Sequence, residues 1–437
     1  MARRGQHTKF GEVLQAAIKA KRVWAIARQV GFVKRKGKIN PNDFLWTLAL
    51  GFGSGRARSI SALRRTYKRV SGTSLVPSSF YDRFNGALVL LLRQVVAYLL
   101  RTLVAPNLRL RGAFAGFSDV VLTDSSVLRL RDNLATKFPA CRTNHTKAAA
   151  KLHAVMSVNG ESRQTVSITD ERTNDRRAFR VGPWVQGRLL LFDLGYFGYR
   201  LFDRIDRNGG WFVSRLKSNS NPTIVSANRE WRGRSIPVVG RPLKEVLGHL
   251  QREVLDVNIE VTFKRRAYKG RASQVTKTFR LVAVRNADSG EYHTYVTNVA
   301  ADKLDAGSVA LAYRARWEIE LLFKAWKSEF RLDELPSRRK EVVEALIYAS
   351  ILTMIVTQRL QAFFRAKAGG NARRVTFGRV AAVVRHFASE LLEVALNLSS
   401  IQQARRLGKL IQEEVLDPHR HRLGLLEQAA GARLEAA

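Results

Sequence analysis

The stretch SDVVLTDSSVLRL, residues 118–130, decides the fold, because the sequence changes there from helical to strand-like patterning. Its β-branched and apolar residues favour a strand. Asp124 lies in the middle of that strand. A buried carboxylate is costly unless it is paired with a cation or binds a metal. A single such residue is most often a structural ion pair, so the rest of the chain has to decide between these two interpretations.

More strand-like runs follow residue 130. HTKAAAKLHAVMSVNG (145–160) and SRQTVSITD (162–170) are joined by an Asn-Gly pair, which is a strong hairpin signal. GRLLLFDLGYFGYRLFDRI (187–205) begins as a continuous apolar strand that ends at Asp193, and another strand follows the Gly-Gly turn at 209–210. Three antiparallel strands followed by strand–helix units predict a mixed α/β sheet.

The patterning divides the chain into five segments. We expect an N-terminal helical DNA-binding domain (1–112), the first part of the sheet domain (113–221), an inserted β-strand subdomain (222–302), the second part of the sheet domain (303–365) and a C-terminal helical region (366–437). Within residues 1–70 the only acids are Glu12 and Asp43, among many lysines and arginines. Asn40, as an N-cap, and Pro41, at the first helical position, predict the start of one helix. Short helices and tight turns there suggest a helix-turn-helix-like bundle. A basic bundle that reads no DNA sequence fits equally well.

The charge of the chain points to a polyanionic partner. The 437 residues include 75 Lys and Arg against 36 Asp and Glu, a formal net charge of +39. Nucleic acid is the favoured partner, because the basic residues are spread over folded segments and not gathered on one amphipathic helix. The apolar stretches 86–100 and 345–360 are too short or too polar to span a bilayer and are expected to be buried helices. We expect no contact with a membrane.

The cysteine content and the N-terminal residues indicate the cellular compartment of the protein. Cys141 is the only cysteine, which excludes an intrachain disulfide and a cysteine zinc site. The first residues, MARRGQHTKFGEV, have no apolar core of the kind that a signal peptide needs. We therefore expect a cytoplasmic protein.

Residues 313–327, YRARWEIELLFKAWK, predict an amphipathic helix with a polar stripe. At about 100° per residue, steps of three, four and seven place the stripe within an arc of roughly 60°; it consists of Tyr313, Arg316, Glu320 and Lys327. An apolar set on the adjoining arc is expected to pack on a core; it consists of Ile319, Leu322, Phe323 and Trp326. The stripe could be a surface ladder of ion pairs. It could also be a functional edge beside a buried face.

Three carboxylates favour the functional interpretation. Asp124 and Asp193 lie on strands of one predicted sheet, and Glu320 lies on the edge of a helix. Oxygen ligands without a His/Cys set suit Mg²⁺ or Mn²⁺ better than zinc. Two such ions about 4 Å apart would activate a water or a 3′-hydroxyl and stabilise the leaving oxygen of a phosphoryl transfer.

These residues carry a family resemblance, which covers roughly residues 40–360. The chain resembles the DDE transposases of the IS4 family of bacterial insertion sequences, whose signature Y-x2-R-x3-E-x6-K is matched at every spacing by Tyr313, Arg316, Glu320 and Lys327. LTDSS around Asp124 resembles the first aspartate motif of the family, and FDLGYF around Asp193 resembles the second. The β-rich segment before Glu320 resembles the insertion that the family carries in its RNase H-like fold.

The resemblance implies cut-and-paste transposition at terminal inverted repeats through a DNA hairpin. Asp124, Asp193 and Glu320 would hold two Mg²⁺ or Mn²⁺ ions per active site. Tyr313, Arg316 and Lys327 would bind phosphates of double-stranded DNA. Paired transposon ends imply a homodimer in the DNA complex, acting in the bacterial cytoplasm on the nucleoid.

The sequence departs from the family at one aromatic position. Some members stack a flipped base on a tryptophan in the insertion, whereas YHTYVTN (292–298) has none. Tyr292 is the candidate for an aromatic contact with DNA. Strand core is the other role open to it.

Two other functions are compatible with the sequence. A catalytically inactive, transposase-derived DNA-binding protein would keep the basic helices but would neither cleave nor join DNA. A plain nuclease of the RNase H type would cut DNA without joining it.

Overall fold

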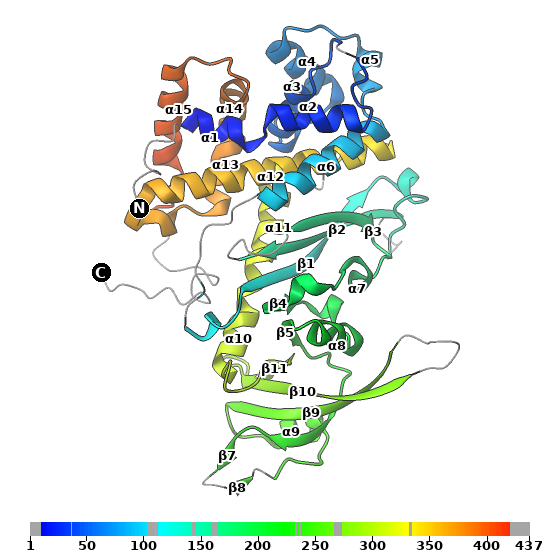
Figure 1. The fold of residues 1–437 in the computed structure, drawn as a ribbon, viewed down its shortest axis with the longest axis vertical. Helices are drawn as coiled ribbons and strands as arrows, with labels where there is room; N and C mark the ends of the chain where they lie inside the picture. Colours follow the sequence, from blue (N-terminus) through cyan, green and yellow to red (C-terminus); the bar gives the residue numbers. More distant parts are fainter. Residues whose placement is uncertain are drawn as a thin grey trace.

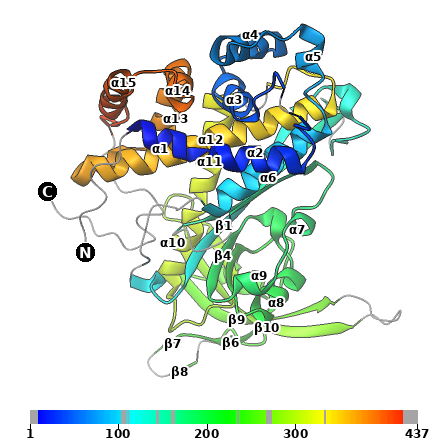
Figure 2. The ribbon, with the colours of Figure 1, turned by 45° about the horizontal axis from the view of Figure 1, so that its top comes forward.

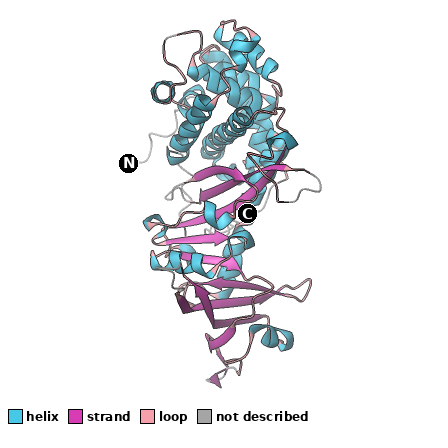
Figure 3. Cartoon of the chain, turned by 90° about the vertical axis from the view of Figure 1, so that its right-hand side faces the viewer, coloured by secondary structure: helices cyan, strands magenta, loops and turns pink. Residues whose placement is uncertain are grey.

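A long mixed sheet lies beneath a layer of helices in the computed structural model (Figures 1 and 3). The structure describes residues 10–35, 37–102, 110, 112–141, 146–158, 164–231, 234–235, 237–265, 273–331 and 334–419. Nine strands form one sheet, in the order β3-β2-β1-β4-β5-β11-β10-β9-β6. The predicted mixed α/β fold is confirmed in these outlines.

The first five strands form the part of the sheet that carries the two aspartates. β1 (Asp119–Leu130), β2 (Ala148–Ser157) and β3 (Thr165–Asp170) pair antiparallel. β4 (Arg188–Phe192) and β5 (Trp211–Arg215) run parallel to β1. This is the predicted succession of three antiparallel strands followed by strand–helix units. The Asn-Gly pair at 159–160 lies outside the described residues.

The two faces of this sheet pack on different sets of helices. Because side chains alternate along a strand, Leu122 and Leu191 enter the core beneath the helical layer, whereas Val121 and Leu190 enter the core on the opposite face. The opposite face packs against α8 (Tyr199–Arg207) and carries the short helix α7 (Asp175–Ala178). Asn174 caps α7 by accepting a hydrogen bond from the backbone N–H of Arg176.

The expected insertion continues the same sheet. Its four long strands are β6 (Thr223–Ala227), β9 (Val254–Lys264), β10 (Gln274–Arg285) and β11 (Tyr292–Thr297). β11 pairs antiparallel with β5, with Val296 opposite Ser214, so the segment is joined edge to edge to the core strands. A small hairpin of β7 (Glu230–Trp231) and β8 (Arg234–Ser235) and the helix α9 (Leu243–His249) complete it.

The N-terminal region is helical, as predicted. Its helices are α1 (Phe10–Ala17), α2 (Ala20–Gln29), α3 (Pro41–Thr47), α4 (Ile60–Ser71), α5 (Pro77–Tyr81) and α6 (Gly86–Thr102), with a π-helical stretch η1 (Leu48–Gly53) continuing α3. The Asn40 side chain accepts from the backbone N–H groups of Asn42 and Asp43, and Pro41 occupies the first helical turn. The predicted cap at Asn40 is therefore confirmed.

The two ends of the chain meet in one helical layer. The C-terminal helices are α12 (Lys340–Ala368), η6 (Gly369–Arg374), α13 (Phe377–His386), α14 (Ala388–Ala395) and α15 (Ile401–Glu414). α1 packs against α12, α14 and α15 (Figure 2), and η1 packs closely on α12. Helices expected in two separate regions thus share one hydrophobic core with the helix-facing side of the sheet.

The two apolar stretches are core helices. Residues 86–100 lie in α6 and residues 345–360 in α12, and both helices bury most of their apolar side chains. One helix in the described part of the chain, Lys340–Arg374, is long and apolar enough to cross a membrane by length and composition. Since 83% of its most apolar window is buried inside the protein, it is the central helix of the helical layer.

Candidate active site

Asp124 lies on β1, and Asp193 directly follows the neighbouring strand β4. Thr123 of β1 is in register with Phe192 of the parallel strand β4, so the residues that follow these two are the aspartates. Adjacent strands are roughly 4.8 Å apart. Asp124 and Asp193 follow the alternation of Leu122 and Leu191, which places both on the face beneath the helical layer.

Glu320 is brought to the same face by α11 (Trp317–Phe330), which packs across β1. Ile319 and Phe323 are buried in the core that this face shares with the helical layer. Glu320 stands at the edge of that buried stripe, with its side chain 30% exposed. The side chains of Leu322 and Trp326, expected in the same apolar set, lie outside the described residues.

The signature does not lie on one continuous helix, which corrects the expectation for residues 313–327. Tyr313 belongs to α10 (Ala306–Ala315), and α11 begins at Trp317. At the junction, Arg316 N–H donates to the Tyr313 carbonyl (3.1 Å) and Ile319 N–H donates to the Arg316 carbonyl (3.2 Å). Both bonds span three residues, so the chain tightens locally into a 3₁₀-type turn. Arg316 occupies this turn and points at the carboxylates.

The Arg316 guanidinium bridges two of the three carboxylates. Its Nη1 lies 3.3 Å from Asp124 Oδ2, and its Nη2 donates to Glu320 Oε1. The Arg316 side chain is only 10% exposed, and its Cζ lies 5.4 Å from the centre of the Tyr313 ring. The stripe is therefore not a surface ladder of ion pairs, because its central cation is buried between two acidic groups from distant parts of the chain.

The electrostatics at Asp124 reflect this crowding. The pKa of Asp124 is raised to about 6, mainly by burial. The Ser125 N–H bond and Arg316 lower this pKa, whereas the charges of Asp193 and Glu320 contribute to raising it. Three like charges within electrostatic reach of one another favour a bound cation. Among the described residues no three His, Cys, Asp or Glu side chains are arranged as a ready metal site. The donor chemistry still fits a hard divalent ion, because all three groups are carboxylates and a cationic group already lies between two of them.

Aromatic residues line the neighbouring part of the same face. The Tyr313 ring packs against Tyr295 of β11, with ring centroids 5.1 Å apart. Burial raises the pKa of Tyr313 to about 12, so its phenol stays protonated at neutral pH. Tyr292 belongs to the opposite face, where its hydroxyl donates to the backbone carbonyls of Leu250 (3.1 Å) and Arg252. The structure does not bring Tyr292 to the carboxylates, whereas it places Tyr295 beside Tyr313.

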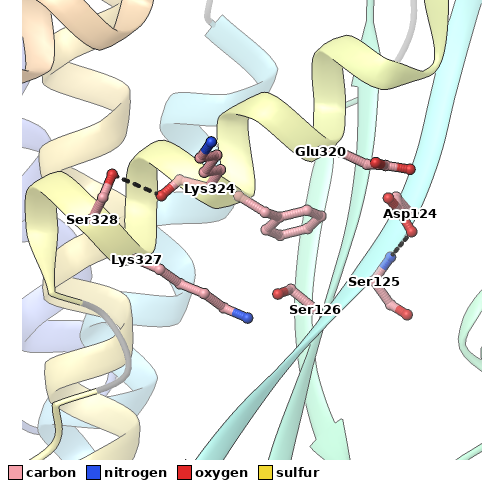
Figure 4. Close-up of a pocket in the computed structure, with 8 residues that line it drawn as sticks. Asp124, Ser125, Ser126, Glu320, Lys324, Lys327 and Ser328 are labelled. Atoms are coloured by element: carbon pink, nitrogen blue, oxygen red, sulfur yellow. Dashed lines mark hydrogen bonds between the residues drawn. The ribbon is translucent and has the colours of Figure 1, made fainter. Parts of the chain in front are cut away.

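An open cavity of about 630 Å³ lies between β1 and α11 (Figure 4). It is lined by Asp124, Ser125, Ser126, Glu320, Phe323, Lys324, Lys327 and Ser328. The predicted residues Asp124, Glu320 and Lys327 thus share one cavity. The side chain of Lys327 extends along it toward β1 in Figure 4. Sequence reasoning missed Ser126 and Lys324; the step of four from Glu320 to Lys324 was the available signal for the lysine.

Comparison with known proteins gives a consistent result. The chain is similar to the transposase for insertion sequence element IS231F of Bacillus thuringiensis subsp. israelensis, at 24% identity over 387 residues that cover 79% of this chain and 78% of that protein. It is also similar to the transposase for insertion sequence element IS1151 of Clostridium perfringens, at 23% identity over 366 residues that cover 77% of this chain and 76% of that protein.

The family comparison covers the whole carboxylate-bearing region. The transposase DDE domain family matches residues 115–356, which is more than half of the 437 residues and includes Asp124, Asp193 and Glu320. The resemblance inferred from the motifs is thereby confirmed. The chain belongs to the transposase DDE domain family.

Proposed function

We propose that this protein is the transposase of an insertion sequence, which cleaves DNA at the terminal inverted repeats of its element and joins the freed ends to target DNA. The observation that carries the proposal is the meeting of Asp124, Asp193 and Glu320 on one face of the sheet, with Asp124 and Glu320 lining an open cavity. The cavity also holds Lys324 and Lys327, which suit a phosphate-bearing substrate.

Asp124, Asp193 and Glu320 are the residues that would hold two Mg²⁺ or Mn²⁺ ions. When bound, such ions activate a water or a 3′-hydroxyl and stabilise the leaving oxygen. Arg316 neutralises Asp124 and Glu320 in the structure as it stands. With DNA bound, the same guanidinium is placed to leave the carboxylates and meet a phosphate bidentately.

The remaining signature residues are proposed to hold the DNA end. Lys327 would contact a phosphate from within the cavity. The protonated hydroxyl of Tyr313 would donate a hydrogen bond near the cleaved terminus, and Tyr295 beside it offers an aromatic surface on the same face. Tyr292 lies on the opposite face of the sheet, so we propose it as a DNA contact only for DNA that binds to that face.

The DNA steps that we propose follow the cut-and-paste order. A first strand is nicked at the transposon end, and the freed 3′-hydroxyl attacks the opposite strand to form a hairpin. Hydrolysis of the hairpin precedes joining of the end to target DNA. Pairing of two ends would require a homodimer on DNA, and we propose that the reaction takes place in the bacterial cytoplasm on the nucleoid.

The test is an assay on DNA that carries the inverted repeats flanking the gene. Purified protein, Mg²⁺ and end-labelled DNA are expected to give hairpins and joined products. Cleavage without hairpins or joining would identify a nuclease. Binding without cleavage would identify a catalytically inactive DNA-binding protein.

A matched pair of variants tests whether Glu320 belongs to the active site. Glu320→Gln is expected to abolish cleavage while DNA binding persists. Glu329→Gln alters a glutamate on the same helix that pairs with Arg385 outside the cavity, and it is expected to cleave normally. Normal cleavage by Glu320→Gln would refute the assignment of the active site.

A further inference from the structure

The first turn of α7 lies directly behind the active site, on the opposite face of the sheet. Asp175, its first residue, accepts a hydrogen bond through Oδ1 from the Ser125 hydroxyl (3.1 Å). Ser125 in turn donates its backbone N–H to Asp124 Oδ1 (2.7 Å). Asp175 is therefore connected to the Asp124 carboxylate through a single residue.

The same turn of α7 packs against the segment that follows Asp193. Asp193 starts the short 3₁₀ helix η5 (Leu194–Tyr196), and its carbonyl accepts from the Tyr196 N–H (3.0 Å). A Cβ on Gly195 would lie 2.5 Å from Asp175 Oδ2, and a Cβ on Gly198 would lie 2.7 Å from Arg176 Nη1. Real Cβ atoms do not come that close to other heavy atoms. Glycine at position 195 therefore lets Asp175 pack on the Asp193 segment, whereas at position 198 the flexible end of the Arg176 side chain could move to make room.

Asp175 is held in place from the strand β2. Lys151 Nζ lies 3.3 Å and His153 Nδ1 lies 3.5 Å from Asp175 Oδ1. Lys151 also donates to the Thr173 carbonyl (3.1 Å), just before α7. The Asp175 side chain is 15% exposed, and the Lys151 ammonium group offsets the cost of burying its charge.

We propose that Asp175 is a positioning residue, which fixes Asp124 and Asp193 relative to each other by bonding to Ser125 and by filling the space at Gly195. It touches neither substrate nor the proposed ions. This inference rests on the proposed function, because it assigns Asp175 to the carboxylate site described above. Removal of an outer partner of a metal ligand typically lowers metal affinity or activity about 10- to 100-fold.

The test is a double-mutant cycle between Asp175 and Gly195 in the full-length protein. Binding of Mn²⁺ to the DNA-free protein is measured by electron paramagnetic resonance, and single-turnover cleavage is measured at saturating Mn²⁺. Asp175→Ala and Gly195→Ala are each expected to weaken Mn²⁺ binding about 10- to 100-fold. The double variant is expected to be no worse than either single variant, because the added methyl then fills the space that the carboxylate left.

Three further variants separate positioning from general stability. Asp175→Asn keeps the volume and an acceptor oxygen, so it is expected to retain most of the Mn²⁺ affinity. Ser125→Ala removes only the hydrogen bond to Asp175 and is expected to lose part of the affinity while folding normally. The control is Asp170→Asn, since the Asp170 carboxylate is bonded to Thr173 in the same loop, and it is expected to leave the affinity unchanged.

Failure of the proposal on Asp175 and failure of the proposed function give different results in these experiments. Native Mn²⁺ affinity in both Asp175→Ala and Ser125→Ala would overturn the proposal, as would independent effects of the Asp175 and Gly195 changes. Equal losses in Asp175→Asn and Asp175→Ala would also contradict it. If the native protein binds Mn²⁺ but never cleaves transposon ends, the proposed function fails, and the binding cycle still reports on Asp175.

Discussion

At the scale of single residues, the buried guanidinium of Arg316 explains how Asp124 and Glu320 can lie together in the absence of a bound ligand. Asp124 and Glu320 each contact one of its terminal nitrogens, so their mutual repulsion is reduced. Desolvation of the charges opposes this gain. The result is a pair of carboxylates held together by an internal cation, with which an incoming divalent ion would have to compete.

The first prediction concerns that competition. Arg316→Ala leaves the buried Asp124 and the partly exposed Glu320 without their cation, so the metal-free protein is expected to lose stability by up to about 3–5 kcal/mol. Added Mn²⁺ is expected to restore more stability to the variant than it gives the native protein. Thermal unfolding with and without Mn²⁺ measures both effects, and equal Mn²⁺-induced shifts in Tm would count against the competition.

The second prediction concerns pH. The pKa of Asp124 is raised from 3.8 to about 6, mainly by burial, so the folded protein holds this proton more tightly than the unfolded chain does. The associated stability is fully present below about pH 3.8 and is lost as the pH rises to about 6. Asp124→Asn carries no such charge. The free energy of unfolding of Asp124→Asn, minus that of the native metal-free protein, is therefore expected to rise between pH 4 and pH 7. The expected rise is about 2–3 kcal/mol, at roughly 1.4 kcal/mol per pKa unit.

The measurement for this prediction is urea unfolding of both proteins across the pH range in the presence of a chelator. A difference between the two proteins that stays constant with pH would show that Asp124 does not carry the shifted pKa.

At the scale of elements, local signals were read correctly where local chemistry decides the structure. Asn40 before Pro41 predicted a helix start, and the apolar run that ends at Asp193 predicted the parallel strand β4. The turn at Arg316 was not predictable, because its side chain is drawn to Asp124 from a distant strand. The pairing of β11 with β5 was missed for the same reason, since it joins residues far apart in the chain.

The residues of the candidate site also divide into those that local sequence patterns predict and those that depend on contacts between distant parts of the chain. Asp124, Asp193 and Glu320 could be selected from strand and helix patterning, because an acid within or at the edge of an apolar pattern is uncommon. Asp175 could not, since its role comes from contacts with Ser125 and Gly195 across the sheet. Tyr295 was one of several aromatics in its strand, and only the fold shows that it faces Tyr313.

The third prediction concerns the π-helical stretch η1 against α12. A Cβ on Gly53 would lie 1.9 Å from Thr353 Oγ1 and 2.7 Å from the Ala349 carbonyl oxygen. Gly53→Ala is therefore expected to destabilise the protein by about 1–3 kcal/mol through overpacking. Gly378→Ala is the control, because a Cβ there meets nothing within 4 Å on a helix. The control is expected to be neutral or stabilising by up to about 1 kcal/mol.

Chemical denaturation of both glycine variants checks this prediction. Equal stability of the two would mean that η1 and α12 separate without cost.

At the scale of the whole molecule, the two ends of the chain depend on each other. α1 packs on α12, α14 and α15, and Thr353 of α12 donates a hydrogen bond to the Ala49 carbonyl (2.6 Å). Deleting residues 1–70 would expose the apolar face of α12. Charge substitutions on the surface are therefore the sound way to locate DNA contacts.

The fourth prediction tests where the net charge of +39 meets DNA. Arg65 and Lys68 are exposed on α4, three residues apart. If the N-terminal helices bind DNA, replacing both with alanine is expected to reduce the slope of log affinity against log salt by about 0.9 per residue. Arg405 and Lys409, exposed on α15, provide the matched control, for which the slope is expected to stay unchanged. A larger change in the control would place the main DNA contacts on the C-terminal helices.

The shared helical layer also bears on the fate of damaged gene copies. Because α1 and η1 bury apolar side chains on α12, a reading frame that stops before residue 340 leaves these sides of α1 and η1 uncovered. Such a fragment is expected to be degraded, and not to persist as a competitor for the element's ends. A broken copy of the element would then be silent, without interfering with intact ones.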